Sequence, residues 1–134
     1  MAKPTAKEPP RSTEPDTVGE KQRALQRMVT LARQLRVELQ HNNVDAFGEI
    51  LHENWELKRG LAPAISSAHI DDWYKRARRA GASGGKVLGA GSGGFMIFYA
   101  PPERHAAITA ALPKLRPIPF CFESQGSKII FVHD

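Results

Sequence analysis

The sequence predicts one α+β domain in which helices come first and an antiparallel sheet follows. Three observations support this class. Up to about residue 80, apolar residues recur at the three- and four-residue steps of amphipathic helices. After a glycine-rich segment, the pattern changes to short apolar and aromatic runs that are typical of strands. A single alanine-rich segment, residues 103–112, separates these runs and predicts a helix that crosses the sheet.

Composition limits the class of protein. The 134 residues suffice for one domain with a core, and the net charge of +5 favours anionic partners. Cys121 is the only cysteine, so no internal disulfide is possible, and we expect a reducing compartment, the cytoplasm. No apolar run approaches the roughly 18 residues of a membrane span, and the first residues lack the apolar core of a secretory signal. We therefore expect no membrane partner.

The chain divides into a tail and a domain. Residues 1–16 contain four prolines, several charges and only alanine as apolar mass, so we expect a disordered tail. Thr17 and Glu20 have the spacing of a helix capping box, so the folded domain is expected to span residues 17–134.

Three helices are expected in the first part of the domain. The first carries one apolar stripe formed by Leu25, Met28, Ala32, Leu35 and Leu39. The second covers Val44–Arg59 and ends at Gly60. The third contains Ile70, Trp73, Tyr74 and Ala77 and stops at Gly81. We interpret Trp55, Trp73 and Tyr74 as core residues.

Four strands are expected in the second part. Two flank the glycine-rich segment, the second of them being Phe95–Ala100. Ile118–Glu123 and Lys128–His133 have strand composition and are joined at residues 124–127. The predicted architecture is therefore a set of N-terminal helices followed by a four-stranded antiparallel sheet with a crossing helix, a ferredoxin-like arrangement.

The segment GGKVLGAGSGG, residues 84–94, holds six glycines in eleven residues and needs an explanation. It is not a nucleotide P-loop, because Val87 stands where that motif needs Ser or Thr. It is not a dinucleotide fingerprint either, because β-prone residues follow it where a helix should begin. Two interpretations remain: a concave loop whose bare backbone amides hold an anion, or a turn whose glycines only relieve crowding.

The candidate binding residues centre on this segment. They are Gly84, Gly85, Lys86, Gly89, Ala90, Gly91, Ser92, Gly93 and Gly94, with Lys58 and Ser66 outside it. Each lysine is either a phosphate ligand or a solvated surface residue, and Lys58 with Arg59 also suits the C-terminal end of a helix. Ser66 and Ser67 are either pocket hydroxyls or helix caps. We assign no catalytic residue and no metal ligand to this chain.

The densest basic run, residues 75–79, allows a different function. Lys75, Arg76, Arg78 and Arg79 could bind nucleic acid through its phosphates. Helical spacing distributes them around an exposed face, however, and the aromatic residues needed for base stacking lie in apolar runs. A nucleic-acid partner is therefore the less favoured expectation.

The segment from Gly85 to Phe95 resembles the third, C-terminal motif of the superfamily of galactokinases, homoserine kinases, mevalonate kinases and phosphomevalonate kinases, the GHMP kinases. The flanking stretches ILHENWELKRGLAPAIS, IDDWYKRARRAGASGGK and PFCFESQGSKIIF look like its sugar-phosphate branch, the D-glycero-D-manno-heptose 7-phosphate kinases. The similarity covers residues 18–134.

The resemblance implies a two-domain enzyme that moves the γ-phosphoryl group of ATP to a sugar hydroxyl. In such enzymes the active site lies between the domains, and the amino-terminal domain carries the main ATP loop, the Mg²⁺ ligands and the acid/base residues. The carboxy-terminal domain, which this chain resembles, supplies the third motif and part of the sugar pocket. ATP, Mg²⁺ and a sugar phosphate are thus the implied cofactors and substrate.

One departure from the family pattern changes the expectation. No P-x-x-x-G-L-G-S-S-type loop occurs in the chain, so the ATP-binding half is absent from this sequence. Because phosphoryl transfer depends on positioning and charge neutralisation, we expect the chain to be inactive alone. It would be an excised domain, one half of a split kinase that needs a separate amino-terminal half, or a degenerate remnant. A protein-interaction module remains an alternative.

Overall fold

The computed structural model describes residues 18–89 and 94–125. In these residues the chain forms four α-helices, two short 3₁₀ helices and two strands. The helices are α1 (Val18–Gln40), α2 (Asp45–Arg59), α3 (Ala68–Ala80) and α4 (His105–Ala111). The strands are β1 (Gly84–Leu88) and β2 (Phe95–Tyr99). The α+β class and the order of helices before strands are confirmed.

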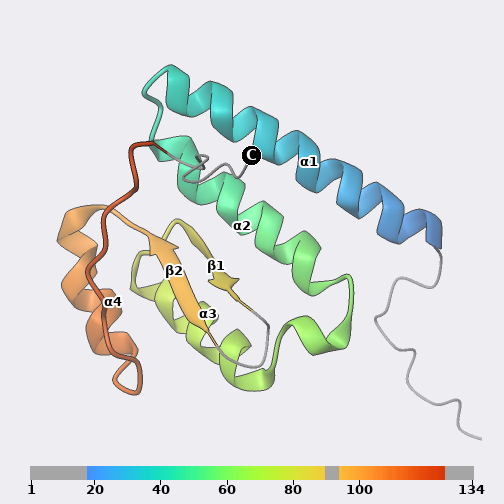
Figure 1. Ribbon diagram of the computed structural model, residues 1–134. Helices are drawn as coiled ribbons and strands as arrows, with labels where there is room; N and C mark the ends of the chain where they lie inside the picture. The colour runs from blue at the N-terminus through green and yellow to red at the C-terminus, as the bar shows by residue number, and fades with distance from the viewer. Residues whose placement is uncertain (1–17, 90–93, 126–134) are drawn as a thin grey trace, which may run out of the picture.

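The helices are arranged in layers around the sheet (Figure 1). Helix α1 packs along α2, and α2 in turn contacts β1 and β2, so α2 lies between α1 and the sheet. Tyr74 of α3 contacts Phe98 of β2, and α3 also packs against α4. The two strands pair antiparallel, with Lys86 opposite Ile97 and Val87 opposite Met96.

Two clusters of buried side chains hold these layers together. Trp55 of α2, Tyr74 of α3 and Val87 of β1 form the first, with Met96 and Phe98 packed against them. Ala77 and Ala82 form the second with Ile108 and Leu112 from the α4 region. The expectation that Trp55 and Tyr74 belong to the core is confirmed, since both are almost fully buried.

Local sequence explains where α3 begins and ends. The Ser67 hydroxyl accepts a hydrogen bond from the Ile70 amide at 3.3 Å, which satisfies one of the free donors at the start of α3. Gly81 ends the helix in the left-handed conformation, with a φ of 114° that a residue with a side chain rarely adopts. Of the two roles open to Ser67, the structure shows the cap.

The face that α1 packs inward differs from the expected stripe. Leu31 is buried, and Met28 and Leu35 are half-buried on the same side. Leu25, Ala32 and Leu39 point away from the core and are exposed. The reason is that α2 covers only one side of α1, and apolar residues occupy about half of its circumference.

The sheet also differs from the expected one. Ile118–Glu123 has no strand pairing in the described residues, and Phe120 and Phe122 are exposed, so the expected third strand is corrected to an irregular segment. A strand requires a neighbouring strand to accept its backbone hydrogen bonds, and the described chain offers none to this segment. The expected fourth strand, 128–133, Thr17 and the tail of residues 1–16 lie outside the described residues.

Gly84 and Gly48 allow β1 and α2 to approach closely. A methyl group on Gly84 would overlap the Gly48 carbonyl group, and a methyl group on Gly48 would overlap the Ser83 side chain. We predict that Gly84→Ala lowers the free energy of unfolding by about 1–3 kcal/mol, because the added carbon forces β1 and α2 apart. Urea denaturation measures the change.

Gly60→Ala is the matched control, since its added carbon would lie 3.5 Å from the nearest carbonyl oxygens and its φ is −76°. We expect a change of less than about 1 kcal/mol there. Equal stability of the two variants would contradict the packing described.

Candidate functional site

Strand β1 and the residues that follow it contain most of the predicted binding residues. Gly84 and Gly85 are buried, against α2 and against Ile97 and Phe98 respectively, so close packing accounts for the absence of a side chain at both. Gly89 follows β1, and Gly94 precedes β2. Residues 90–93, which include the predicted Ala90, Gly91, Ser92 and Gly93, lie outside the described residues.

Gly89 and Gly94, which flank residues 90–93, have backbone conformations that favour glycine. Gly89 has a φ of 102° and Gly94 a φ of 139°. A side chain on Gly94 would in addition overlap the Leu88 carbonyl oxygen. The backbone at these two positions is therefore free of side-chain cover for a steric reason.

Lys86 and Lys58 form a pair of like charges. Lys86 lies on the side of β1 that Gly84 shares, the side against α2, and Lys58 lies in the last turn of α2. Partial burial, followed by the charge of Lys58, lowers the pKa of Lys86. Neither lysine has an ion pair with a carboxylate in the described residues. The structure therefore brings two predicted cations together without a counter-charge.

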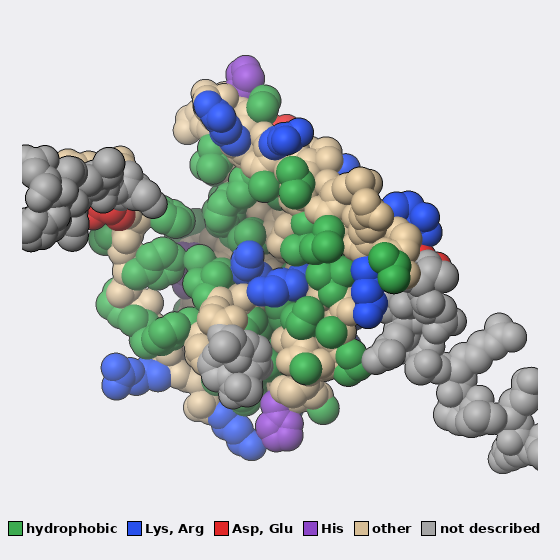
Figure 2. Space-filling view, turned by 45° about the vertical axis from the view of Figure 1, so that its right-hand side comes forward, with side chains coloured by type: hydrophobic (Ala, Val, Ile, Leu, Met, Phe, Trp, Pro, Cys, Tyr) green, Lys and Arg blue, Asp and Glu red, His purple; other side chains and the backbone are tan. Residues whose placement is uncertain are grey.

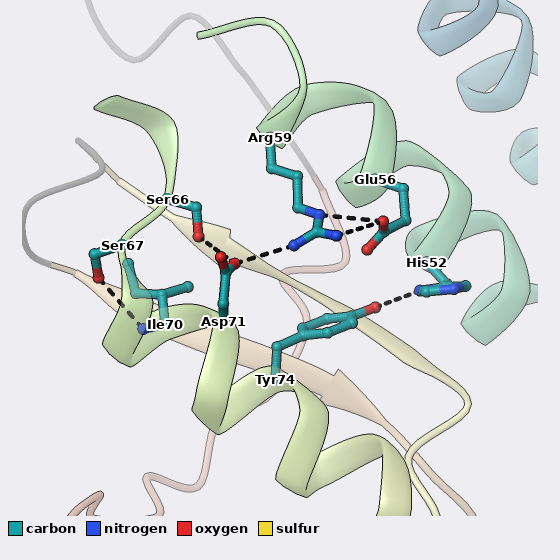
Figure 3. Close-up of polar contacts among 8 residues, drawn as sticks. All are labelled: His52, Glu56, Arg59, Ser66, Ser67, Ile70, Asp71 and Tyr74. Atoms are coloured by element: carbon teal, nitrogen blue, oxygen red, sulfur yellow. Dashed lines mark hydrogen bonds and ion pairs between the residues drawn. The ribbon is translucent and has the colours of Figure 1, made fainter. Parts of the chain in front are cut away.

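Arg59, next to Lys58, is by contrast fully paired (Figure 3). Its guanidinium lies 2.9 Å from Glu56 and 3.2 Å from Asp71, and the Ser66 hydroxyl donates to the same Asp71 oxygen at 2.7 Å. Burial lowers the pKa of Arg59, but the two carboxylates more than offset this and raise it. Ser66 thus joins the start of α3 to α2 through Asp71, a structural role that the sequence did not reveal.

The Tyr74 hydroxyl links α3 to α2 and β1. Its hydroxyl lies 2.8 Å from His52 Nδ1 of α2 (Figure 3) and forms a hydrogen bond with the Gly85 backbone. Burial is the main reason why the pKa of Tyr74 is raised to about 12. Sequence reasoning placed Tyr74 in the core but missed its polar contacts, because no sequence signal shows that α2, α3 and β1 meet at this hydroxyl.

The basic run on α3 is divided by its contacts. Arg76 pairs with Asp72 at 2.8 Å, and Arg78 donates to the carbonyl oxygens of Ala82 and Ser83. Lys75 and Arg79 remain exposed. The run therefore does not present all its cations to one partner.

The donor set suits an anion. Two lysines and the backbone of a glycine segment can hold a phosphate, whereas no group of three His, Cys, Asp or Glu that could hold a metal occurs in the portion of the chain that is described. No described helix is long and apolar enough to cross a bilayer.

Comparison with known proteins identifies the family. The model of the C-terminal domain of GHMP kinases matches residues 35–116, so the chain belongs to the GHMP kinase family. The match includes Lys58, Ser66 and all of residues 84–94. The resemblance seen in the sequence is confirmed.

Curated relatives include three kinases. The chain is 34% identical over 82 residues to D-glycero-alpha-D-manno-heptose 7-phosphate kinase of Campylobacter jejuni, covering 60% of this chain and 24% of that protein. It is 34% identical over 83 residues to the bifunctional fucokinase/GDP-fucose pyrophosphorylase of Arabidopsis thaliana, covering 62% of this chain and 8% of that protein. It is 31% identical over 96 residues to mevalonate kinase of Methanothermobacter thermautotrophicus, covering 72% of this chain and 30% of that protein. The aligned stretches thus span less than a third of each relative.

The like-charge pair predicts a titration effect. In Lys58→Met the pKa of Lys86 should rise toward the ordinary lysine value without reaching it, because the second charge is gone but burial remains. Side-chain NMR during a pH titration measures this. Lys75→Met, an exposed lysine of α3, is the control and should leave the pKa of Lys86 unchanged. An unchanged pKa of Lys86 in the Lys58→Met variant would show that the two charges do not interact.

Tyr74 predicts a pH dependence of stability. Its pKa is about 12 in the fold against an ordinary value of 10.0, so the unfolded chain loses this proton first. The contribution of Tyr74 to stability is therefore complete below about pH 10 and is lost as the pH rises to about 12. Urea denaturation should show Tyr74→Phe less stable by about 1–3 kcal/mol at neutral pH, with a difference that shrinks above pH 10. A difference that is constant across this range would contradict the assignment.

Proposed function

We propose that the chain is the carboxy-terminal, substrate-side part of an ATP-dependent sugar-phosphate kinase of the heptose 7-phosphate type. Membership of the GHMP kinase family supports the kinase class, and the 34% identity to the Campylobacter jejuni heptose phosphate kinase supports the substrate class. The observation that carries the proposal is the pair Lys58 and Lys86, which has no ion pair with a carboxylate among the described residues.

Each group has a role in this proposal. Lys58 and Lys86 neutralise the negative charge of a phosphate, which offsets the repulsion between the two lysines. The backbone amides from Gly89 to Gly94 donate to phosphate oxygens. Gly84 lets β1 lie close to α2, so that Lys86 and Lys58 reach the same ligand, and Gly85 lets β1 lie close to Phe98 of β2. Ser66 acts indirectly, because its hydroxyl donates to Asp71, and Asp71 in turn pairs with Arg59, the neighbour of Lys58.

Mg²⁺ and ATP belong to the proposal as cofactor and substrate. When bound, Mg²⁺ neutralises charge on the phosphates during transfer. The residues described here fit the phosphate and not the metal, since they offer lysines and backbone amides without a cluster of carboxylates. We therefore propose that the metal ligands and the main ATP loop are supplied by an amino-terminal half, as a second polypeptide or a further domain.

Binding of phosphate compounds tests the site. We predict that inorganic phosphate, ATP and a heptose 7-phosphate shift the backbone NMR signals of Lys58 and of residues 84–94. Lys86→Met and Lys58→Met should each weaken binding about tenfold, because a hydrogen bond to a charged group is lost. Lys75→Met is the control. Shifts confined to residues 75–79 would instead favour the nucleic-acid alternative.

An activity assay tests whether the chain needs a separate amino-terminal half. The chain alone should show no sugar-dependent ATP consumption, whereas a mixture with the amino-terminal half of a heptose 7-phosphate kinase should restore it. A coupled ADP assay with purified components measures both. Full turnover by the chain alone would overturn the proposal that it is incomplete, while leaving phosphate binding to be judged by the NMR titration.

A further inference from the structure

Helix α1 has a second apolar side that no described residue covers. Leu25, Val29 and Leu39 are 51%, 52% and 47% exposed, and Ala32 is exposed on the same side. These four residues, here called the outer stripe, follow one another at steps of four, three and seven, which places them along one line of a helix. Figure 2 shows that hydrophobic and basic side chains cover much of one face of the molecule, whereas acidic ones are few.

The charged residues of α1 that lie next to the outer stripe are all basic. Viewed along the axis of α1, the angular position of Arg36 falls between those of Leu25 and Val29. Arg33 and Lys21 border the stripe on either side. The two acidic residues of α1, Glu20 and Glu38, lie one above the other five turns apart, on the side of the helix that faces α2. No ion pair involves Lys21, Arg33 or Arg36 among the residues described.

The C-terminal half of the outer stripe borders a hollow. A shallow, open depression of about 490 Å³ is lined by Ala32, Leu35, Arg36, Leu39 and Gln40. Its lining is mostly apolar, with Arg36 as the one charged member. Such a surface accepts an apolar side chain of a partner and offers a guanidinium to a carboxylate beside it.

We propose that the outer stripe docks an amphipathic helix of another protein, one whose apolar side is flanked by Asp and Glu. The stripe supplies the apolar contacts of a helix–helix pair, and Lys21, Arg33 and Arg36 supply the charge complement. This inference goes beyond the proposed kinase activity and does not depend on it.

Two other occupants fit the observations less well. A second copy of the chain would bring the same three cations to the interface, and α1 has no acidic residue on that side to pair with them. A lipid bilayer would have to bury Arg36, which stands within the stripe, and the stripe has no aromatic residue to lie at the interface. A carboxylate of a protein partner meets Arg36 without either difficulty.

Three labelled peptides test the proposal by fluorescence anisotropy with the full chain. The first is a designed amphipathic helix with a leucine stripe and glutamate flanks. The second has the same stripe with lysine flanks, and the third has the composition of the first in scrambled order. The first should bind at least about tenfold more tightly than either of the other two. Equal binding of all three, or no binding of the first, would overturn the proposal.

Paired variants locate the binding surface. Arg33→Glu with Arg36→Glu should weaken binding of the glutamate-flanked peptide about tenfold and should permit binding of the lysine-flanked one. Leu25→Ser with Val29→Ser should weaken binding of the glutamate-flanked peptide to a similar extent. Lys75→Glu with Arg79→Glu makes the same change in net charge on α3 and is the matched control, expected to bind as the unaltered chain does.

The alternative occupants give different results. All the altered residues are exposed, so circular dichroism should show unchanged helix content, which keeps a loss of binding interpretable. A dimer in sedimentation that dissociates on Leu25→Ser with Val29→Ser would overturn the proposal in favour of a second copy. Binding to phosphatidylserine vesicles that requires the same residues would overturn it in favour of a membrane.

Discussion

The close approach of β1 to α2 is the constraint on which the rest of the structure depends. A side chain on Gly84 would overlap the Gly48 carbonyl group, and a side chain on Gly48 would overlap Ser83. This approach places Trp55 against Val87 in the core and puts the last turn of α2 beside Lys86. Glycine at these positions costs conformational entropy, and the burial of Trp55, Tyr74 and Val87 offsets that cost.

The same approach has an electrostatic consequence. Cations at the end of a helix are ordinary, because they interact favourably with its carbonyl groups. Here Arg59 is neutralised by Glu56 and Asp71, whereas Lys58 is left to repel Lys86. An arrangement that places like charges together without compensation is unfavourable for the empty protein and becomes favourable once an anion is bound. Membership of a family of kinases makes a phosphate the natural anion to propose.

Much of the helical fold could be predicted from the sequence because capping and periodicity are local signals. Gly60 and Gly81 end α2 and α3 as expected, and Ser67 begins α3. The rotation of α1 could not be predicted, because apolar residues occupy half of its circumference and only the position of α2 decides which of them are buried. The expected strand at Ile118–Glu123 is unpaired in the described residues, and composition shows strand preference but not whether a neighbouring strand is present.

The candidate site was predictable in its residue types and not in its contacts. Glycine density and the two lysines were visible in the sequence, but the hydrogen bonds of Ser66 and Tyr74 depend on how α2 and α3 meet.

The most direct test of the central claim is a crystal structure of the chain with a non-hydrolysable ATP analogue. The account predicts a phosphate group within hydrogen-bonding distance of Lys58, Lys86 and the backbone between Gly89 and Gly94. Phosphates bound at Lys75 and Arg79, with both Lys58 and Lys86 unoccupied, would contradict it.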